Sequence, residues 1–266
     1  MTKRIKSDNI LKVENLCMYF GGIRAVDGIS FEIKKGEIFG LIGPNGAGKT
    51  TVFNCITQFY KPTSGKVRLF DKNGESVDLT EVKVHDVSTY GVVRTFQNVE
   101  VVPELTVVDN LLLAAHRQYR SGFLTQMLHL KGLEKEEREM RKKAEEVLEF
   151  MGISMYKDWY AAALPYGILK KVEIARTLMG NPRLIILDEP AAGLNGKETE
   201  ELAALIGRIR DVYGCAVFLV EHDMGLVMNI CDRILAISFG KFLAVGSAEE
   251  IQSNRDVRRA YLGESS

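Results

Sequence analysis

One segment of the chain has residue types that fit the binding of a phosphate group. Its pattern, G-x4-G-K-T, lets successive backbone N–H groups curl around an anion, because glycine has no Cβ to clash. Lys49 is placed to reach the β and γ phosphates of a nucleotide, and the Thr50 hydroxyl to ligate Mg²⁺. A glycine-rich turn followed by Lys-Thr by chance is the alternative, expected in roughly 1% of chains of this length. The segment comprises Gly43, Pro44, Asn45, Gly46, Ala47, Gly48, Lys49 and Thr50, with Thr51 directly after it.

Acidic and imidazole side chains follow two apolar runs further along the chain. Asp188 and Glu189 end the run LIIL, and His222 follows the run AVFLV after one glutamate. Buried parallel strands deliver such residues to their carboxyl edge, where ligands bind. Asp188 is therefore expected to serve the Mg²⁺ shell, Glu189 to polarise a water, and His222 to contact the γ-phosphate. Acids that merely end a strand, and a structural histidine, are the alternatives.

The elements around the phosphate segment suit this chemistry. An apolar strand is expected over Ile38–Ile42 and a helix over 51–59, whose positive end points at the phosphates. Alternating patterns over 11–37 and 66–70 predict an antiparallel sheet beside the nucleotide core. Phe20 lies ahead of the loop and can stack on an adenine, although an aromatic here is more often a core residue.

The middle of the chain has a helical character. Thr106 can cap a helix with Asp109 three residues on, and a second helix is expected over about 133–151. Asn195 with Glu198, and later residues 247 and 250, have the same capping pattern. A helical subdomain is thus predicted between two halves of an α/β core.

Composition narrows the function classes. The chain has 266 residues, 46% hydrophobic and 26% charged, with 35 basic and 35 acidic side chains. This balance gives no overall field to attract nucleic acid or anionic lipid. No apolar run approaches the ~18 residues of a membrane span, and none follows the basic start MTKRIKSDN, so a signal peptide is not expected. The four cysteines lack metal-site spacing and predict buried thiols.

The order and spacing of these motifs resemble the ATP-binding cassette family, in which a long interval separates the loop from the acidic strand. Here Asp188 follows Lys49 by 139 residues (188 − 49). The resemblance implies an α/β fold, a P-loop NTPase core with an antiparallel β subdomain and an inserted α-helical subdomain. It implies ATP and Mg²⁺ as ligands, Phe20 as the adenine-stacking aromatic, and Gln97 as the glutamine that senses Mg²⁺ and water. It also implies Glu189 as catalytic glutamate, His222 as switch histidine and residues 191–195 as the D-loop.

Phrases along nearly the whole chain, among them GVVRTFQNV, DEPAAGLN, EHDMGLVM and RDVRRAYLGE, are similar to the ATP-binding subunits of branched-chain amino acid importers. That resemblance implies a second ATPase subunit, in a homodimer or a paralogous heterodimer, two transmembrane permease subunits and, indirectly, a periplasmic or extracellular solute-binding protein. It implies a peripheral position at the cytoplasmic face of the membrane and no nucleic acid partner. Residues 99–105 are expected to belong to the docking surface. The expected core covers residues 1–97 and 181–266, and the helical subdomain about 98–180.

The sequence departs from the family at its signature segment, which in the family contacts the nucleotide of the partner subunit. Pro165 stands where the signature has serine, and it has neither hydroxyl nor N–H to donate to the γ-phosphate. A charge-assisted hydrogen bond is worth ~1.5–3 kcal/mol, so ATP-driven closure is expected to be weaker by that order. The segment reads Leu164, Pro165, Tyr166, Gly167 and Ile168.

Two alternatives to an importer ATPase remain open. A soluble cassette ATPase outside transport is one, although the chain has no basic excess and no coiled-coil insertion. The other is a module that binds ATP and hydrolyses it weakly or not at all, for which Pro165 and Ile168 are the reason.

Overall fold

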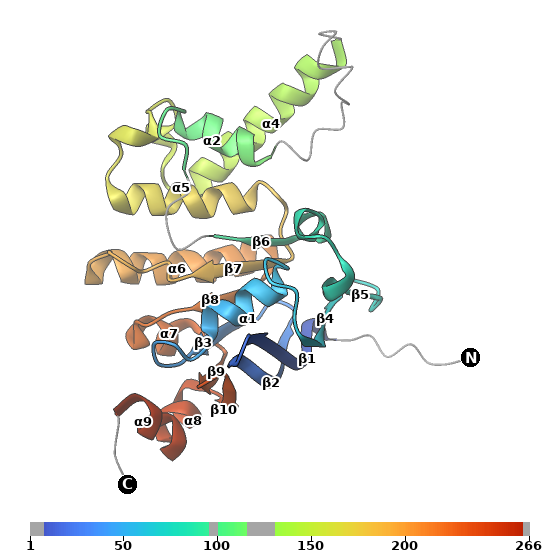
Figure 1. The fold of residues 1–266 in the computed structure, drawn as a ribbon. Coiled ribbons are helices and arrows are strands. Elements are labelled where there is room, and N and C mark those ends of the chain that lie inside the picture. Colours follow the sequence, from blue (N-terminus) through green and yellow to red (C-terminus); the bar gives the residue numbers. More distant parts are fainter. Residues whose placement is uncertain (1–7, 96–100, 116–130, 263–266) are drawn as a thin grey trace. The chain divides into compact units, whose positions relative to one another are not determined.

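The computed structural model describes residues 8–95, 101–115 and 131–262 of the chain (Figure 1). Their contacts divide them into two units. The first unit combines the chain up to Arg94 with the chain from Arg183 onward, and the second covers Thr95–Pro182.

Among the described residues, six strands of the first unit form one sheet in the order β10 (Lys241–Gly246), β9 (Arg233–Ser238), β3 (Ile38–Ile42), β8 (Ala216–Val220), β7 (Leu184–Asp188) and β6 (Val92–Arg94). All neighbours are parallel except β10, which runs antiparallel to β9. Every residue of β3, β7 and β8 is buried, as their unbroken apolar runs predict for central parallel strands. The parallel order brings the carboxyl ends of β3, β7 and β8 to one edge.

The predicted antiparallel sheet is present, in the order β2 (Ile23–Lys34), β1 (Asn9–Phe20), β4 (Ser64–Phe70) and β5 (Ser76–Asp78). Aromatic rings join it to the parallel sheet. Phe31 of β2 stacks on Phe39 of β3 with 5.6 Å between centroids, and Phe218 of β8 lies 5.6 Å from Phe31. The two sheets therefore share one apolar core, which also includes Ala47 of the phosphate segment.

The helices of the first unit are α1 (Lys49–Ile56), α6 (Gly196–Tyr213), α7 (Met224–Ile230), α8 (Ala248–Ser253) and α9 (Arg255–Leu262). The predicted caps of α6 and α8 are confirmed, since Asn195 with Glu198 and Ser247 with Glu250 each form a capping box. The expected extent of α1 to residue 59 was wrong. The helix ends at Ile56 because Gln58 adopts a left-handed backbone conformation, with φ 61°, that a right-handed helix cannot continue.

The α-helices of the second unit within the described residues are α2 (Val107–Ala114), α4 (Lys131–Phe150) and α5 (Tyr166–Leu178), which contact one another. The predicted cap of α2 is confirmed, because the Thr106 hydroxyl accepts the N–H of Asp109 at 3.2 Å. Short 3₁₀ turns occur at Ser154–Tyr156 and Ala161–Ala163, and in the first unit at Leu79–Glu81 and Val84–Tyr90. On α4 the side chains of Ala144, Val147 and Leu148 are buried, as is Met151 directly after the helix.

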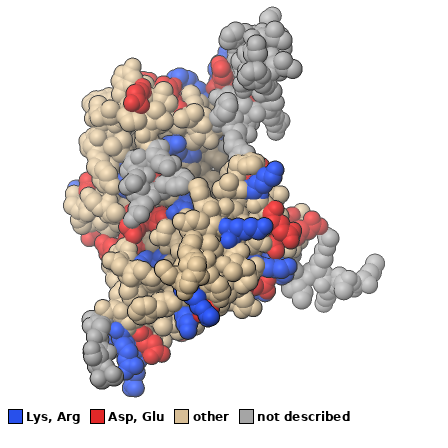
Figure 2. All heavy atoms as spheres, in the orientation of Figure 1, with Lys and Arg blue, Asp and Glu red and all other residues tan. Residues whose placement is uncertain are grey.

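Charged side chains of both signs lie interspersed on the face shown in Figure 2, in keeping with the balanced composition. Within the described residues, none of the helices combines the length and apolar character that crossing a membrane requires. The four cysteines are free; Cys55 and Cys215 are buried as predicted, whereas Cys17 and Cys231 are partly exposed. Burial raises the pKa of the Cys55 thiol to about 12 and that of Cys215 to about 11, so both are poor nucleophiles.

Candidate functional site

The phosphate segment connects β3 to α1, and its geometry requires glycine at two places. A Cβ on Gly43 would lie 2.4 Å from the carbonyl oxygen of Ile237, which is far inside contact distance. Gly48 has φ 101°, and a Cβ there would lie 2.4 Å from the carbonyl oxygen of Ala25. Backbone of two other strands thus presses against the segment, and only glycine leaves room for this path.

Lys49 begins α1 and is almost fully buried. Its Nζ donates to the carbonyl oxygens of Gly43 at 2.7 Å and Pro44 at 3.1 Å, so the side chain curls back across the segment. Burial lowers the pKa of Lys49, while the carboxylates of Glu189 and Asp188 act in the opposite direction. The ammonium therefore lies within the field of both acids, as expected where a phosphate and a metal ion are bound.

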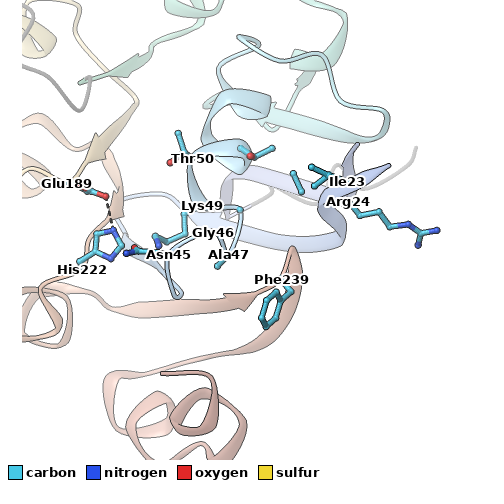
Figure 3. A pocket seen from close by; sticks show the side chains of 13 residues that line it. Ile23, Arg24, Asn45, Gly46, Ala47, Lys49, Thr50, Glu189, His222 and Phe239 are labelled. Atoms are coloured by element: carbon cyan, nitrogen blue, oxygen red, sulfur yellow. Dashed lines mark ion pairs between the residues drawn. The ribbon is translucent and has the colours of Figure 1, made fainter. Parts of the chain in front are cut away.

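A pocket of about 430 Å³ surrounds the segment (Figure 3). It brings together side chains that are far apart in the sequence, and Figure 3 shows Lys49 beside the segment while Arg24 points away from it. Phe239 lies on the hairpin between β9 and β10 and is 87% exposed. The lining comprises residues 45–51, Ile23, Arg24, Ala25, Glu189, His222 and Phe239.

Glu189 and His222 meet at this pocket. The Nε2 of His222 lies 2.8 Å from the Oε1 of Glu189, and Figure 3 shows the two side chains facing each other. Glu189 follows β7 with φ 49°, a left-handed conformation that is strained for a residue with a Cβ. Its N–H donates to the carbonyl oxygen of Val220, 2.9 Å away, which anchors it to the end of β8.

Asp188 is buried and paired with an arginine that the sequence alone did not single out. Arg94 of β6 donates from Nη2 to the Oδ2 of Asp188 at 2.7 Å and from Nη1 to the Oδ1 of Asn54 at 2.6 Å. Its guanidinium also lies over the rings of Phe53 and Phe59. A single basic residue within an apolar strand was the available signal, but only the pairing of β6 with β7 places it beside Asp188.

The oxygen donors near the phosphate segment suit an Mg²⁺ ion that is held mainly by the phosphates of a nucleotide. Within the described chain, no group of three or more His, Cys, Asp or Glu side chains could hold a metal ion by itself. Mg²⁺ usually keeps several waters and takes one or two protein oxygens plus substrate phosphates. The Thr50 hydroxyl and the Asp188 carboxylate are oxygen donors of that kind. Gln97, the third predicted ligand, lies outside the described residues.

The predicted adenine contact stays a prediction. Phe20 ends β1, is 42% exposed, and packs edge-on against Tyr60 with 5.3 Å between centroids. The neighbouring Tyr19 is occupied elsewhere, because its hydroxyl donates to Asp27 at 2.9 Å. Neither Phe20 nor Tyr19 is among the residues that line the pocket.

Glu221 is a second side chain near the site to which the sequence assigned no part, although its position between β8 and His222 was visible. It is almost fully buried, and its carboxylate accepts backbone N–H groups on both sides of the site. The position of Glu221 in the sequence, directly before His222, indicated that it lies near the site. It did not indicate which N–H groups its carboxylate accepts.

The signature segment lies in the second unit. Pro165 is the N-cap of α5 and makes no side-chain hydrogen bond to the first turn. Its carbonyl oxygen accepts the N–H groups of Ile168 and Leu169, each at 3.0 Å. Leu164 is buried, Tyr166 is exposed, and Gly167 is the second residue of α5. Their contact with a nucleotide of another subunit stays a prediction.

Two family models match the chain. Residues 26–192 match the model described as ABC transporter, and residues 243–266 match the model described as branched-chain amino acid ATP-binding cassette transporter. The chain is 46% identical over 255 residues to the high-affinity branched-chain amino acid transport ATP-binding protein BraF of Pseudomonas aeruginosa, covering 96% of this chain and 98% of the relative.

Solved structures agree with these matches. The ADP conformation of MJ1267, an ATP-binding cassette of an ABC transporter, superposes with a TM-score of 0.82 at 34% identity, covering 97% of this chain and 100% of that one. A dimeric post-hydrolysis state of the cassette MJ0796, bound to ADP and Pi, has a TM-score of 0.72 at 26% identity, with 90% and 98% covered.

Proposed function

The chain belongs to the ATP-binding cassette ATPases of ABC transporters, and on that premise we propose that it hydrolyses ATP to energise the import of branched-chain or related amino acids. BraF of Pseudomonas aeruginosa and LivG of Salmonella typhimurium, which the chain matches over nearly their full length, are branched-chain amino acid transport ATP-binding proteins. The C-terminal match to a model of that same transport group supports the narrower assignment.

The observation that carries the proposal is the Glu189–His222 pair, 2.8 Å apart, in one pocket with the phosphate segment. Phosphoryl transfer to water needs a group that orients the water and positive groups that stabilise charge on the γ-phosphate. In the proposed site Glu189 orients the water, and His222 holds the γ-phosphate. Lys49 and the N–H groups of residues 45–51 hold the phosphate chain.

Thr50, Asp188 and Gln97 would hold Mg²⁺. When bound, Mg²⁺ neutralises charge on the β- and γ-phosphate oxygens. Arg94 donates to the Asp188 carboxylate and to Asn54 of α1, so this carboxylate is held in place before the nucleotide arrives. Phe20 would stack on the adenine.

A second ATPase subunit would complete each site. Residues 164–168 of one chain would face the γ-phosphate bound by the other, with the Gly167 N–H and the start of α5 as donors. The dimeric structure of the cassette MJ0796, bound to ADP and Pi, supports the pairing of two chains. We assign the nucleotide core to the first unit and the contact in trans to the second. Two permease subunits, docked at the surface that includes residues 99–105, would hold the ATPase at the cytoplasmic face of the membrane. They would receive the movement by which the two ATPase subunits close around ATP.

The test is phosphate release by the full chain, alone and in proteoliposomes with its permease subunits and solute-binding protein. We expect slow release alone and a rise when leucine, isoleucine or valine is added to the assembled system. A full complex that releases phosphate but ignores every amino acid would contradict the import assignment. A pull-down that recovers only soluble proteins or nucleic acid would favour an ATPase outside transport.

A second candidate function, a module that binds ATP with little turnover, is motivated by Pro165 and Ile168 in the signature segment, because Pro165 has neither hydroxyl nor N–H to donate to a γ-phosphate. Pro165→Ser restores a hydroxyl and an N–H at this place. If the signature limits turnover, this variant should release phosphate faster than the wild-type chain at saturating ATP. Tight ATP binding without release by either protein would favour the binding module.

A further inference from the structure

Glu221 is a buried carboxylate that has no role in the proposed hydrolysis of ATP as described above. It follows β8 and is 3% exposed. Its Oε1 accepts the N–H of Ala191 at 2.6 Å, and its Oε2 accepts the N–H groups of His222 at 2.9 Å and Asp223 at 3.2 Å. One side chain therefore joins the loop after β7 to the loop after β8.

These two loops carry the residues of the proposed hydrolysis site. Ala191 lies two residues beyond Glu189, and His222 is the direct neighbour of Glu221. The left-handed backbone of Glu189 is held on its N-terminal side by the bond from its N–H to Val220. Glu221 supplies the hold on the other side, at Ala191. Strained backbone persists only where its surroundings fix it from several directions.

Only a carboxylate can make this set of bonds. A carboxylate has two acceptor oxygens and no donor, so it can face N–H groups on both sides. A glutamine has one oxygen, and its amide donors would face N–H groups at the other end. The two loops would then lose either the bond at Ala191 or the pair of bonds at His222 and Asp223.

The stability of the folded chain does not by itself explain why an acidic residue occupies position 221. Burial raises the pKa of Glu221, and the nearby Glu189 adds to this, while the amide N–H groups of Ala191, Asp223 and His222 act in the opposite direction. The net direction is upward, which means that the surroundings disfavour the charged form. Buried groups that cost stability are often retained because a site requires them.

We propose that Glu221 is a positioning residue for ATP hydrolysis, which fixes the loop of Glu189 relative to the loop of His222. The inference rests on the proposed function. Glu221 touches neither water nor nucleotide in this role; it acts by keeping the carboxylate and the imidazole at the spacing in which both serve one γ-phosphate. The phosphate segment and Lys49, which hold most of the phosphate chain, make none of these bonds, so we expect the affinity for ATP to change little when Glu221 is replaced.

The test is Glu221→Gln in the full chain, with kcat for phosphate release and the Kd for ATP measured side by side. Misplacing a reacting group by about 1 Å can cost up to ~100-fold in rate, so we expect kcat to fall by roughly 10- to 100-fold. The Kd for ATP should stay within about twofold. Glu221→Asp keeps the charge but withdraws it by one methylene, so it should also lower kcat.

Glu37→Gln is the matched control. Glu37 is likewise buried and accepts a backbone N–H, from Lys34 at 2.6 Å, and it pairs with Arg233. It precedes β3, at the opposite end of that strand from the phosphate segment. Losing these bonds should lower the melting temperature and leave kcat unchanged within about twofold.

Three results would overturn the inference. Glu221→Gln or Glu221→Asp with wild-type kcat would show that the spacing does not depend on this side chain. A parallel loss of kcat, ATP affinity and melting temperature in both variants would assign Glu221 a structural role only. A wild-type chain that releases no phosphate, alone or with its permeases, contradicts the proposed function and the inference with it. An active wild type with an equally active Glu221→Gln contradicts the inference alone.

Discussion

Arg94→Met removes the guanidinium that holds Asp188. The flexible methionine side chain still fills most of the space beside Phe53 and Phe59. The arginine side chain is 9% exposed and the aspartate 3%, so the ion pair is buried. The variant leaves a buried carboxylate facing an apolar group. It also removes the 2.6 Å bond from Arg94 to Asn54, which joins β6 to α1.

Breaking a buried ion pair by removing one partner typically costs about 3–5 kcal/mol, because the remaining charge has lost its compensation. For a chain of this size, each kcal/mol lowers the melting temperature by roughly 2–4 °C. The expected fall is therefore about 6–20 °C. Removing both charges in Arg94→Met/Asp188→Asn should recover at least half of the loss, since the buried side chain that has lost its arginine is then neutral.

The assay is thermal and urea unfolding of the full chain without nucleotide, with Arg68→Met as control. Arg68 pairs with Glu14 at 3.0 Å, but the two side chains are 38% and 31% exposed. Exposed pairs contribute about 0–1 kcal/mol, so this variant should unfold like the wild type. Equal effects of Arg94→Met and Arg68→Met, or no recovery in the double variant, would refute the assigned role of Arg94.

Three further predictions concern the loop, the buried acid and the base. Gly43→Ala forces a Cβ against the carbonyl oxygen of Ile237, so the variant should show no ATP binding in isothermal titration calorimetry. The control Gly207→Ala adds a Cβ in open space on α6, and it should stabilise the chain by ~0.5–1 kcal/mol. Because burial raises the pKa of Glu221 above its ordinary 4.5, the wild type should lose stability relative to Glu221→Gln as pH rises from about 4.5 through the folded pKa. A stability difference in urea that is constant over pH 4–8 would contradict this sign. Phe20→Ala should weaken ATP binding by about 1–2 kcal/mol, and Phe20→Trp should preserve it; unchanged affinity in the alanine variant would place the base elsewhere.

The parts of the fold that the sequence predicted are those that local physics controls. Unbroken apolar runs become buried parallel strands because both faces are covered, and the capping pairs at Asn195 and Ser247 form within four residues of chain. The end of α1 was missed because the left-handed conformation of Gln58 depends on how the chain leaves the helix, and glutamine has no preference for it.

The same distinction applies to the site. Lys49, Glu189 and His222 could be selected because each follows a strand at the edge where ligands bind. The partners of Asp188 and Glu221 could not, because they depend on strand order and side-chain rotamers. Arg94 lies 94 residues before Asp188, and Ala191 lies 30 residues before Glu221. No local pattern links such pairs.

The central claim is that one chain holds the phosphates and the water-orienting acid, while a second chain closes the site. Glu189→Gln is expected to bind ATP without hydrolysing it, and this variant should therefore trap the closed pair. Light scattering on a sizing column at saturating Mg-ATP should give twice the mass of one chain, reverting to one chain with ADP. A Glu189→Gln chain that binds ATP and still elutes as a monomer would contradict the account.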